Sequence, residues 1–362
     1  MERVKVGFIG LGHVGQIAHF KNYLYNDKAV INGICDSRQD LIKKVGDLYA
    51  IDNYTSHADQ LINDPNIEAL VIVVDRGSVY SLCKKALEAK KHVFTEKPMA
   101  LSTDAAIELV KIAKENQVIY KIGFMRKYDT GIRSFVSELK NFINNNSLGR
   151  LSLLRIHAFD SVSSYAGGFD STTTNTEKKM STDPLDQVPE WIPKDRRLDY
   201  LNTLNVYCHH LNLLHSIFDD SFTIKINYVN FQYRHCRIVS LTIEKNKKFS
   251  EIILELGHIP SIIHDEYIEA SFEGGTYRVD FPPNMLRDGT AQTILNTYSS
   301  DVQSIQKRIF QYSWSFRNQA IDFIEDVQNL RYECINSGFD CIRDMAFHDK
   351  LWKQEISRSK ND

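Results

Sequence analysis

The sequence predicts an α/β protein with an N-terminal doubly wound parallel sheet and a C-terminal α+β domain whose sheet is open and predominantly antiparallel. Apolar strand-like segments alternate with helical segments over about the first 120 residues. A glycine-rich turn follows the first of these strands. Beyond Gly123 the repetition gives way to long alternating segments, which are typical of an antiparallel sheet. We therefore expect two domains, residues 1–122 and 123–362.

The composition is that of a globular protein and excludes several classes. The 362 residues suit two domains, and 43% are hydrophobic and 25% charged. A net charge of -2 gives no reason to expect a nucleic acid or an anionic membrane as partner. No apolar run approaches the roughly 20 residues that span a bilayer, and no signal peptide is evident, so we expect a cytoplasmic protein. The six scattered cysteines form no Cys-x-x-Cys pair, which favours free thiols over a zinc or redox site.

A dinucleotide-binding turn is predicted directly after the strand at residues 3–9. Residues 10–15 read Gly-Leu-Gly-His-Val-Gly, a full G-x-G-x-x-G, and a helix is expected from Gly15 to about Tyr25. The second strand, Val30 to Cys35, ends at Asp36, 21 residues after Gly15, where an acidic residue would bind the ribose hydroxyls. The glycines let the backbone approach a pyrophosphate, and the helix N-terminus favours its charge. The alternative is a structural turn that binds nothing.

The residues after Asp36 bear on the choice of cofactor. A carboxylate at this position accepts hydrogen bonds from a free ribose diol and repels a 2′-phosphate, which favours NAD. Arg38 could stack on the adenine or reach a 2′-phosphate, so NADP stays open. The expected cofactor-binding residues are Gly10, Gly12, His13, Val14, Gly15, Asp36, Ser37, Arg38, Val74, Glu96 and Lys97.

The remaining elements follow in order. In the first domain we expect helices at 37–48, 56–63, 78–90 and 103–116. We also expect strands at 69–74 and 118–123, and between them a strand that ends at Thr95. The second domain should contain helices at 131–143, 203–218, 315–329 and 339–357, and strands at 151–160, 222–234, 237–244, 250–257, 266–272 and 276–281. Residues 161–200 are rich in Ser, Thr, Gly and Pro and indicate a long loop.

Lys97 is the first candidate for chemistry. Val93 and Phe94 read as buried strand residues, and Glu96-Lys97-Pro98 then ends the strand. Ligands of parallel sheets bind beyond the carboxyl ends of the strands, so Lys97 is placed to contact a substrate. The alternative is a solvated turn lysine.

Several stretches together resemble one family, that of glucose-fructose oxidoreductase, inositol dehydrogenase and MocA-type proteins. They are the glycine turn, Glu96-Lys97-Pro98, the segments 123–128 and 208–212, and Phe316-Arg317-Asn318-Gln319-Ala320 with Phe323. The resemblance implies an N-terminal Rossmann domain and a C-terminal domain that forms homodimers or homotetramers through its sheet. It also implies a cis Lys97–Pro98 bond, and a final helix that packs back on the N-terminal domain. The implied reaction is nicotinamide-dependent oxidation or reduction at a carbon of a sugar, polyol or nucleotide sugar.

The sequence departs from the family pattern at two places. Val74-Asp75 and Val79 stand where members often carry Thr-Pro and a later His, which puts the usual contacts near the nicotinamide in doubt. The second departure is at the catalytic helix, where members often have Asp-x-x-x-His. Here Asn205 precedes His209, and Asn212 replaces a further Asp.

His209 is the second candidate, because histidine titrates closest to neutral pH and could exchange the hydroxyl proton. Asn205 lies one turn earlier on the same helix face and could orient the ring, although without the charge of an Asp. Lys97 would stabilise the developing alkoxide. Substrate contacts are expected from Arg126, Tyr128, Asn205 and His210. Alternatives are that Arg126 and Tyr128 pair between domains and that His209 is a core residue; the histidine spacing does not indicate a metal site.

These residues lead to one functional hypothesis and two alternatives. The hypothesis is an NAD(P)-dependent oxidoreductase that acts on a secondary alcohol or ketone of a sugar-like small molecule. The first alternative is a redox-neutral enzyme, in which transient oxidation is followed by epimerisation or elimination. The second is a non-catalytic regulator that binds a dinucleotide on the same fold. Retention of both Lys97 and His209 argues against the regulator, and the two Asn residues argue mildly for it.

Overall fold

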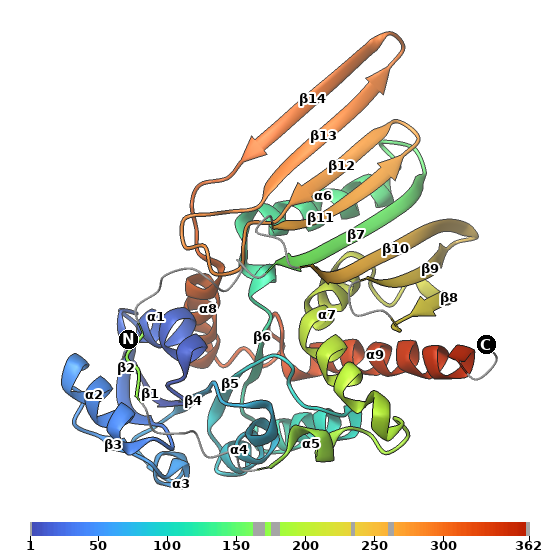
Figure 1. The fold of residues 1–362 in the computed structure, drawn as a ribbon. Helices are drawn as coiled ribbons and strands as arrows, with labels where there is room; N and C mark the ends of the chain where they lie inside the picture. Colours follow the sequence, from blue (N-terminus) through green and yellow to red (C-terminus); the bar gives the residue numbers. More distant parts are fainter. Residues whose placement is uncertain (1, 162–170, 175–181, 233–235, 260–263, 360–362) are drawn as a thin grey trace. The chain divides into compact units, whose positions relative to one another are not determined.

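The computed structural model describes residues 2–161, 171–174, 182–232, 236–259 and 264–359. The chain forms two compact units (Figure 1). The first comprises Met1–Phe124, Phe169–Cys208 and Phe316–Ala346, and the second comprises Met125–Gly168, His209–Ser315 and Phe347–Asp362. Whereas the sequence analysis placed one boundary between residues 122 and 123, each unit is assembled from three segments. The segment 169–208, from the middle of the chain, belongs to the first unit.

The first unit contains a parallel sheet of six strands in the order β3-β2-β1-β4-β5-β6. This order is that of a doubly wound Rossmann sheet and confirms the predicted fold class. The strands are β1 (Val4–Ile9), β2 (Ala29–Cys35), β3 (Tyr54–Thr55), β4 (Ala69–Ile72), β5 (His92–Glu96) and β6 (Tyr120–Gly123). β1 pairs with β2 and with β4, so the strand order reverses beside β1, where such sheets bind their ligands.

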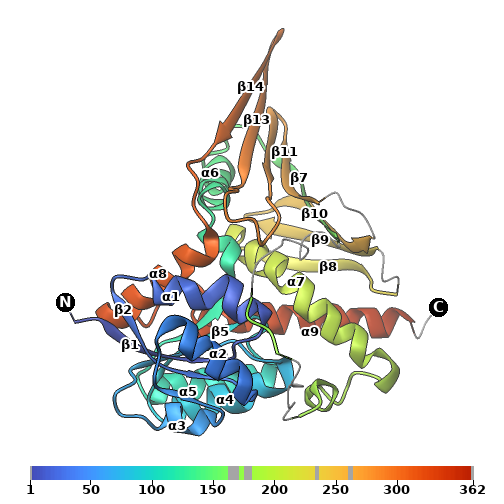
Figure 2. The same ribbon diagram turned by 60° about the vertical axis from the view of Figure 1, so that its left-hand side comes forward.

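Helices cover both faces of this sheet. They are the π-helix η1 (Gly15–Phe20), α1 (Lys21–Leu24), α2 (Gln39–Tyr49), α3 (Ala58–Ile62), α4 (Arg76–Glu88), α5 (Thr103–Glu115) and α8 (Ser315–Asn329). Figures 1 and 2 show α1 and α8 on one face and α3, α4 and α5 on the other. Each of the helices predicted for this part of the chain is present. The helix expected from Gly15 to Tyr25 begins as a π-helix and continues as α1.

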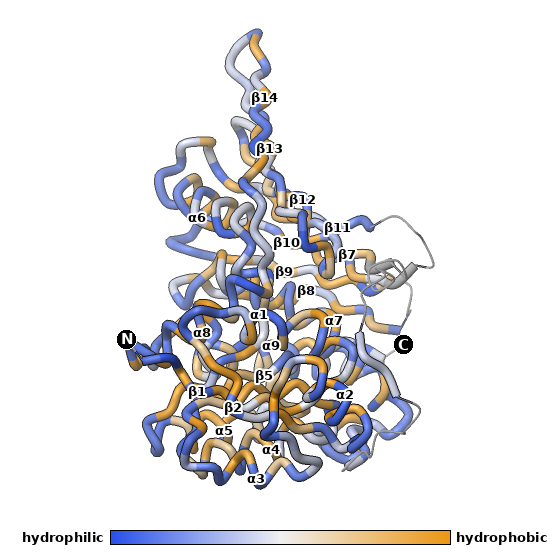
Figure 3. The backbone as a smooth tube through the Cα atoms, turned by 90° about the vertical axis from the view of Figure 1, so that its left-hand side faces the viewer, coloured by the Kyte–Doolittle hydropathy of each residue, from blue (hydrophilic) through white to orange (hydrophobic). Residues whose placement is uncertain are grey.

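The core of the first unit joins the sheet to α1 and α8. The ring of Phe94 on β5 lies 5.7 Å from that of Phe323 on α8, and Phe8 on β1 lies 5.3 Å from Phe20. Apolar segments accordingly gather around β1 and β5 in Figure 3. Lys121 on β6 is fully buried and forms ion pairs with Asp322 and Asp326 of α8. These contacts fix α8 on the sheet, because a buried ammonium is stable only with such partners.

The second unit contains an eight-stranded sheet in the order β14-β13-β12-β11-β7-β10-β9-β8. Among the described strands of this sheet, only β7 and β10 pair in parallel, so the predicted open and predominantly antiparallel sheet is confirmed. The strands are β7 (Leu151–Ser161), β8 (Thr223–Asn230), β9 (Arg237–Lys245), β10 (Lys248–Ile259), β11 (Asp265–Phe272), β12 (Gly275–Asp280), β13 (Gln292–Ser299) and β14 (Val302–Ile309).

One face of this sheet is packed and the other is open. Helix α6 (Thr130–Asn145) lies along the packed face in Figures 1 and 2, where Phe135 stacks on Tyr277 at 4.8 Å. Buried and half-buried residues alternate along β11 and β12, as the period of two in the sequence predicts. The half-buried residues form the open face.

The β13–β14 hairpin was not predicted. Nearly every residue of β14 is exposed, so the strand has no buried face and no period-two pattern. Figure 3 shows this hairpin mostly in blue and white, with isolated orange segments.

The connection before α7 also differs from the expected loop. The part of it that the structure describes contains two short 3₁₀ helices, η4 (Pro184–Gln187) and η5 (Lys194–Arg196). Helix α7 begins at Arg197, earlier than predicted, and ends at Ile217. A third 3₁₀ helix, η2 (Met125–Tyr128), precedes α6, and α9 (Gly338–Ser359) closes the chain. The last part of α9 belongs to the second unit, where Trp352 packs on Phe231. Among the described residues, no helix is long and apolar enough to cross a membrane.

Candidate active site

The glycine turn connects β1 to η1, and its three glycines serve different purposes. Gly10 has φ +100°, and a Cβ there would lie 2.1 Å from the carbonyl oxygen of Val73. A Cβ on Gly15 would lie 2.2 Å from the carbonyl oxygen of Gly10. The protein itself therefore requires these two glycines. Around Gly12, by contrast, a Cβ would meet nothing within 4 Å. The open space at Gly12 fits the close approach of a dinucleotide pyrophosphate to the backbone.

Other predicted cofactor residues surround the turn. Val74 follows β4, and its Cγ1 would lie 3.0 Å from a Cβ on Gly10. Val14 immediately precedes η1, and His13 is exposed beside it. The first helical N–H groups therefore follow the open position at Gly12, as anion binding at a helix N-terminus requires. The turn thus has the geometry to hold a dinucleotide phosphate.

Asp36 is buried at the end of β2 and bound on both carboxylate oxygens. Its Oδ2 accepts from the backbone N–H of Leu11 at 2.9 Å, which ties the acid to the glycine turn. Arg38 donates from Nε to Oδ1 at 2.7 Å and from Nη2 to Oδ2 at 2.8 Å. Burial alone would raise the pKa of Asp36, but these hydrogen bonds outweigh it and lower the pKa. Asp36 is therefore a carboxylate at neutral pH, and Ser37 beside it is exposed.

Lys97 stands at the carboxyl end of β5, and the Lys97–Pro98 bond is cis, as the resemblance implied. Its Nζ donates to the backbone oxygen of Asn205 at 2.8 Å and lies 3.4 Å from Asn205 Oδ1. Asn205 lies on the part of α7 that belongs to the first unit. The structure therefore brings Lys97 and Asn205 together. His209 belongs to the second unit, so its pairing with Lys97 stays a prediction.

Glu96 reveals a residue that the sequence analysis missed. His19 Nε2 lies 2.8 Å from Glu96 Oε1, and the backbone N–H of Lys97 donates to Glu96 Oε2 at 3.2 Å. The His19 ring is 1% exposed and packs against Phe94 and Phe316. One carboxylate thus connects the helix of the glycine turn to the turn that carries Lys97. A histidine four residues after Gly15 gave no signal of this role, because the pairing joins residues far apart in sequence.

In the second unit, Arg126 and His210 meet on one acid, Glu266. Arg126 Nη2 lies 2.6 Å from Glu266 Oε2, and His210 Nε2 lies 2.9 Å from Oε1. Burial alone would raise the pKa of Glu266, but the charge of Arg126 and the His210 hydrogen bond lower it to about 2. The sequence analysis did not single out Glu266. Arg126 thus has an ion-pair partner within its own unit, and Tyr128 is buried; their roles toward a substrate stay predictions.

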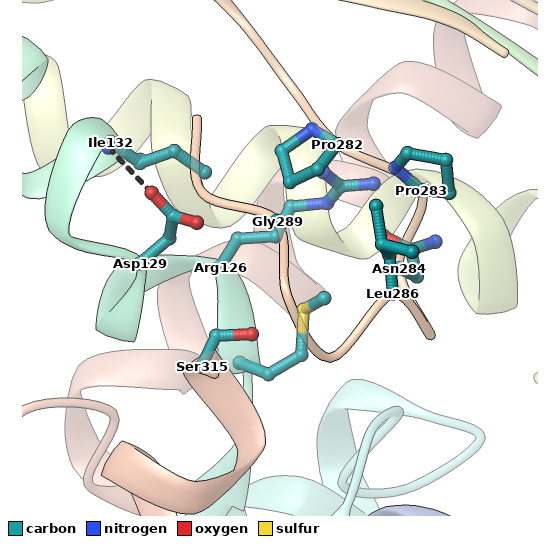
Figure 4. A pocket seen from close by; sticks show the side chains of 10 residues that line it. Arg126, Asp129, Ile132, Pro282, Pro283, Asn284, Leu286, Gly289 and Ser315 are labelled. Atoms are coloured by element: carbon teal, nitrogen blue, oxygen red, sulfur yellow. Dashed lines mark hydrogen bonds between the residues drawn. The ribbon is translucent and has the colours of Figure 1, made fainter. Parts of the chain in front are cut away.

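Arg126 also lines a pocket of the second unit. Figure 4 shows the pocket between η2, the start of α6 and the loop that carries Pro282, Pro283 and Asn284. Asp129 lines the pocket as well and caps α6 by accepting from the backbone N–H groups of Gly131 and Ile132. Burial raises the pKa of Asp129 despite these hydrogen bonds.

Comparison with known proteins supports the fold and the dinucleotide turn. Residues 4–124 match a family model described as an oxidoreductase family with an NAD-binding Rossmann fold. Myo-inositol 2-dehydrogenase of Thermotoga maritima is 30% identical over 157 residues, which cover 43% of this chain and 46% of the relative. Inositol 2-dehydrogenase/D-chiro-inositol 3-dehydrogenase of Lacticaseibacillus casei is 33% identical over 141 residues, which cover 38% of this chain and 40% of the relative. The chain thus spans less than half the length of either relative.

Solved structures match over nearly the whole chain. KijD10, a 3-ketoreductase from Actinomadura kijaniata solved with NADP and TDP-benzene, superposes with a TM-score of 0.72 at 12% identity and covers 98% of each chain. The dehydrogenase MviM from Clostridium difficile has a TM-score of 0.67 at 14% identity and covers 97% of this chain and 99% of its own. At such identities the likeness shows the fold alone. Residues 4–124 are thus similar to the Gfo/Idh/MocA oxidoreductase family, whose model describes an NAD-binding Rossmann fold.

Proposed function

We propose that this protein is an NAD(P)-dependent oxidoreductase that acts on a secondary alcohol or ketone carbon of a sugar, polyol or nucleotide sugar. The observation that carries the proposal is the position of Lys97, which extends from the carboxyl end of β5 in the unit that also holds the glycine turn. A bound nicotinamide would supply or accept the hydride. The protein would bind the substrate, orient it and move the proton.

The hydrogen bonds of Lys97 support a role at the substrate oxygen. An ammonium has three N–H donors, and the contacts described for Nζ go to two neutral oxygens of Asn205. Neutral acceptors fix the side chain without cancelling its charge. Lys97 can therefore direct a remaining donor at an alkoxide that develops on the substrate, where a preorganised charge stabilises the transition state. His209 is proposed to exchange the hydroxyl proton with the substrate.

The substrate class rests on the relatives. The two sequence relatives described above are named inositol dehydrogenases, and KijD10 is named a 3-ketoreductase and was solved with TDP-benzene. These names support a polyhydroxylated ring or a nucleotide sugar as the substrate. Arg126, Tyr128 and His210 are the proposed substrate contacts of the second unit, and Asn205 that of the first.

NAD is the proposed cofactor, with NADP as the competitor. The Asp36 carboxylate lies where the adenosine ribose is expected, and it keeps its negative charge because of Arg38 and Leu11. A ribose diol can donate to this carboxylate, whereas a 2′-phosphate would be repelled by it. Arg38 is already engaged with Asp36, which leaves it less available for a 2′-phosphate.

The open face of the second unit's sheet supports a homo-oligomer. Its residues on β11 and β12 are half-buried, and apolar side chains are exposed on β14, with Ile305 67% and Ile309 72% exposed. An exposed edge strand with apolar side chains is a surface that proteins usually cover. We propose a homodimer or homotetramer through this sheet. Light scattering of the purified protein tests it, and a monomer at micromolar concentration would contradict it.

The activity is tested by a screen of NAD⁺ and NADP⁺ reduction with inositols, aldoses and nucleotide sugars, and of the reverse reaction with keto sugars. We expect turnover with at least one compound, and Lys97→Met should reduce it about 10³-fold because a charge at the reacting oxygen is lost. Dinucleotide affinity of this variant should stay within threefold. Lys111→Met, on the exposed surface of α5, is the matched control. Dinucleotide binding without any redox reaction, net or internal, would favour the regulator and refute the proposal.

A further inference from the structure

Residues Ser171 to Thr174 lie against the glycine turn, although they are more than 150 residues away in sequence. Gln16 Nε2 donates to the backbone oxygen of Thr172 at 2.9 Å, and the backbone N–H of Thr172 donates to Gln16 Oε1 at 2.8 Å. The Gln16 side chain is buried and also donates to the backbone oxygen of Leu11 at 2.8 Å. One amide group therefore ties this segment to the helix that follows the glycines.

Two further contacts fix the segment on either side of this amide. His13 Nδ1 lies 3.1 Å from Ser171 Oγ, and Lys44 Nζ donates to the backbone oxygen of Thr173 at 3.3 Å. His13 belongs to the turn after β1, and Lys44 belongs to α2, the helix after β2. In a doubly wound fold these two elements flank the pyrophosphate and the adenosine ribose. The segment 171–174, which we name the strap, therefore connects the two walls of the adenosine side of the site.

The strap leaves the phosphate position free. A Cβ on Gly12 would meet nothing within 4 Å, so no strap atom occupies the space beside this glycine. The strap contacts given above are with His13 in the glycine turn, with Gln16 just after it and with Lys44 on α2. The strap and a bound dinucleotide are thus compatible. Because the strap spans the site without filling it, we expect it to slow dissociation of the dinucleotide more than it hinders binding.

From this geometry we propose that the strap is part of the dinucleotide site and slows release of the bound cofactor. The proposal rests on the proposed function only in requiring that the protein binds a nicotinamide dinucleotide. It assigns Gln16 as the residue that holds the strap closed. The expected result is a low dissociation rate of NADH that depends on the Gln16–Thr172 pair.

Stopped-flow NADH fluorescence tests the proposal on the full chain. Thr172→Pro removes the N–H that Gln16 accepts and leaves the Gln16–Leu11 bond in place. We expect it to raise the dissociation rate roughly tenfold, the size expected for losing one or two hydrogen bonds, with little change in the association rate. Gln16→Ala, a second variant outside the strap, should raise it similarly. Lys44→Met should raise the dissociation rate about twofold. Lys43→Met, which changes the neighbouring exposed lysine, is the control and should leave the rate unchanged.

Two results would overturn the proposal. The first is a dissociation rate within twofold of the wild type in both Thr172→Pro and Gln16→Ala. The second is faster association with tighter binding, which would make the strap an obstacle to entry. Circular dichroism confirms that each variant is folded. If the wild type binds neither NADH nor NADPH, the proposed function is refuted as well. If the wild type binds the cofactor and the variants release it at the wild-type rate, only the proposed role of the strap is refuted.

Discussion

Glu266 offers a quantitative test of how the second unit holds Arg126 and His210. Its pKa is lowered to about 2 from an ordinary value of 4.5. At about 1.36 kcal/mol per pKa unit, this lowering corresponds to about 3 kcal/mol of folding stability. Because the pKa is lower in the folded state, this stability is present above pH 4.5 and is lost as the pH falls toward 2. About 2 kcal/mol should be lost between pH 7 and pH 3.

The perturbation is Glu266→Gln, which removes the titrating group but keeps the shape of the side chain. At pH 7 the variant should be less stable by about 3–5 kcal/mol, because Arg126 becomes a buried charge without its carboxylate. Between pH 7 and pH 3 the difference in unfolding free energy between wild type and variant should shrink by about 2 kcal/mol. Urea unfolding followed by tryptophan fluorescence measures it, since Trp314 and Trp352 both lie in the second unit.

Glu269→Gln is the matched control, because Glu269 lies on the same strand but is 29% exposed. It should change stability by less than about 1 kcal/mol at either pH. The reasoning fails if the difference between wild type and Glu266→Gln stays constant from pH 7 to pH 3. A constant difference would mean that Glu266 is not the acid-sensitive group of this unit.

Three further predictions concern the first unit. His19→Leu should lower kcat about 10- to 100-fold with little change in NADH affinity, because Glu96 loses its hydrogen-bonding partner. His19→Gln should restore much of the rate, and an equal loss of rate in both variants would contradict this prediction. Asp36→Ser should shift the ratio of NADH to NADPH affinity at least tenfold toward NADPH, since it frees Arg38; fluorescence titration with both cofactors measures it. Lys121→Met should destabilise the protein by about 3–5 kcal/mol in urea unfolding, because Asp322 and Asp326 lose their buried partner.

The fold of the first unit follows from local sequence signals. β1, β4 and β5 are short apolar runs that only a parallel sheet buries on both faces. Helices of this unit have clear caps, such as Asp75 before α4 and Ser102 before α5. The β13–β14 hairpin shows the limit of this approach. Its stability comes from pairing with β12 and not from a buried face of its own, so hydropathy carries no signal for it.

Predictions about the candidate site divide in the same way. The glycine turn and Asp36 could be found because their spacing is set by one continuous βαβ segment. The hydrogen-bonding and ion-pair partners of the site residues could not be found from the sequence. His19 meets Glu96, Glu266 meets Arg126, and Thr172 meets Gln16 only after folding brings distant segments together. A single sequence contains no distance information across such separations.

Asn205 illustrates what the structure adds to the sequence. From the sequence, its replacement of a family Asp weakened the expected support of His209. In the structure its backbone and side-chain oxygens face Lys97 Nζ at 2.8 Å and 3.4 Å. A carboxylate at this distance would form an ion pair and draw the ammonium charge away from a substrate oxygen. An amide holds the same position and leaves the charge available. The replacement is therefore compatible with the proposal that Lys97 stabilises the reacting oxygen.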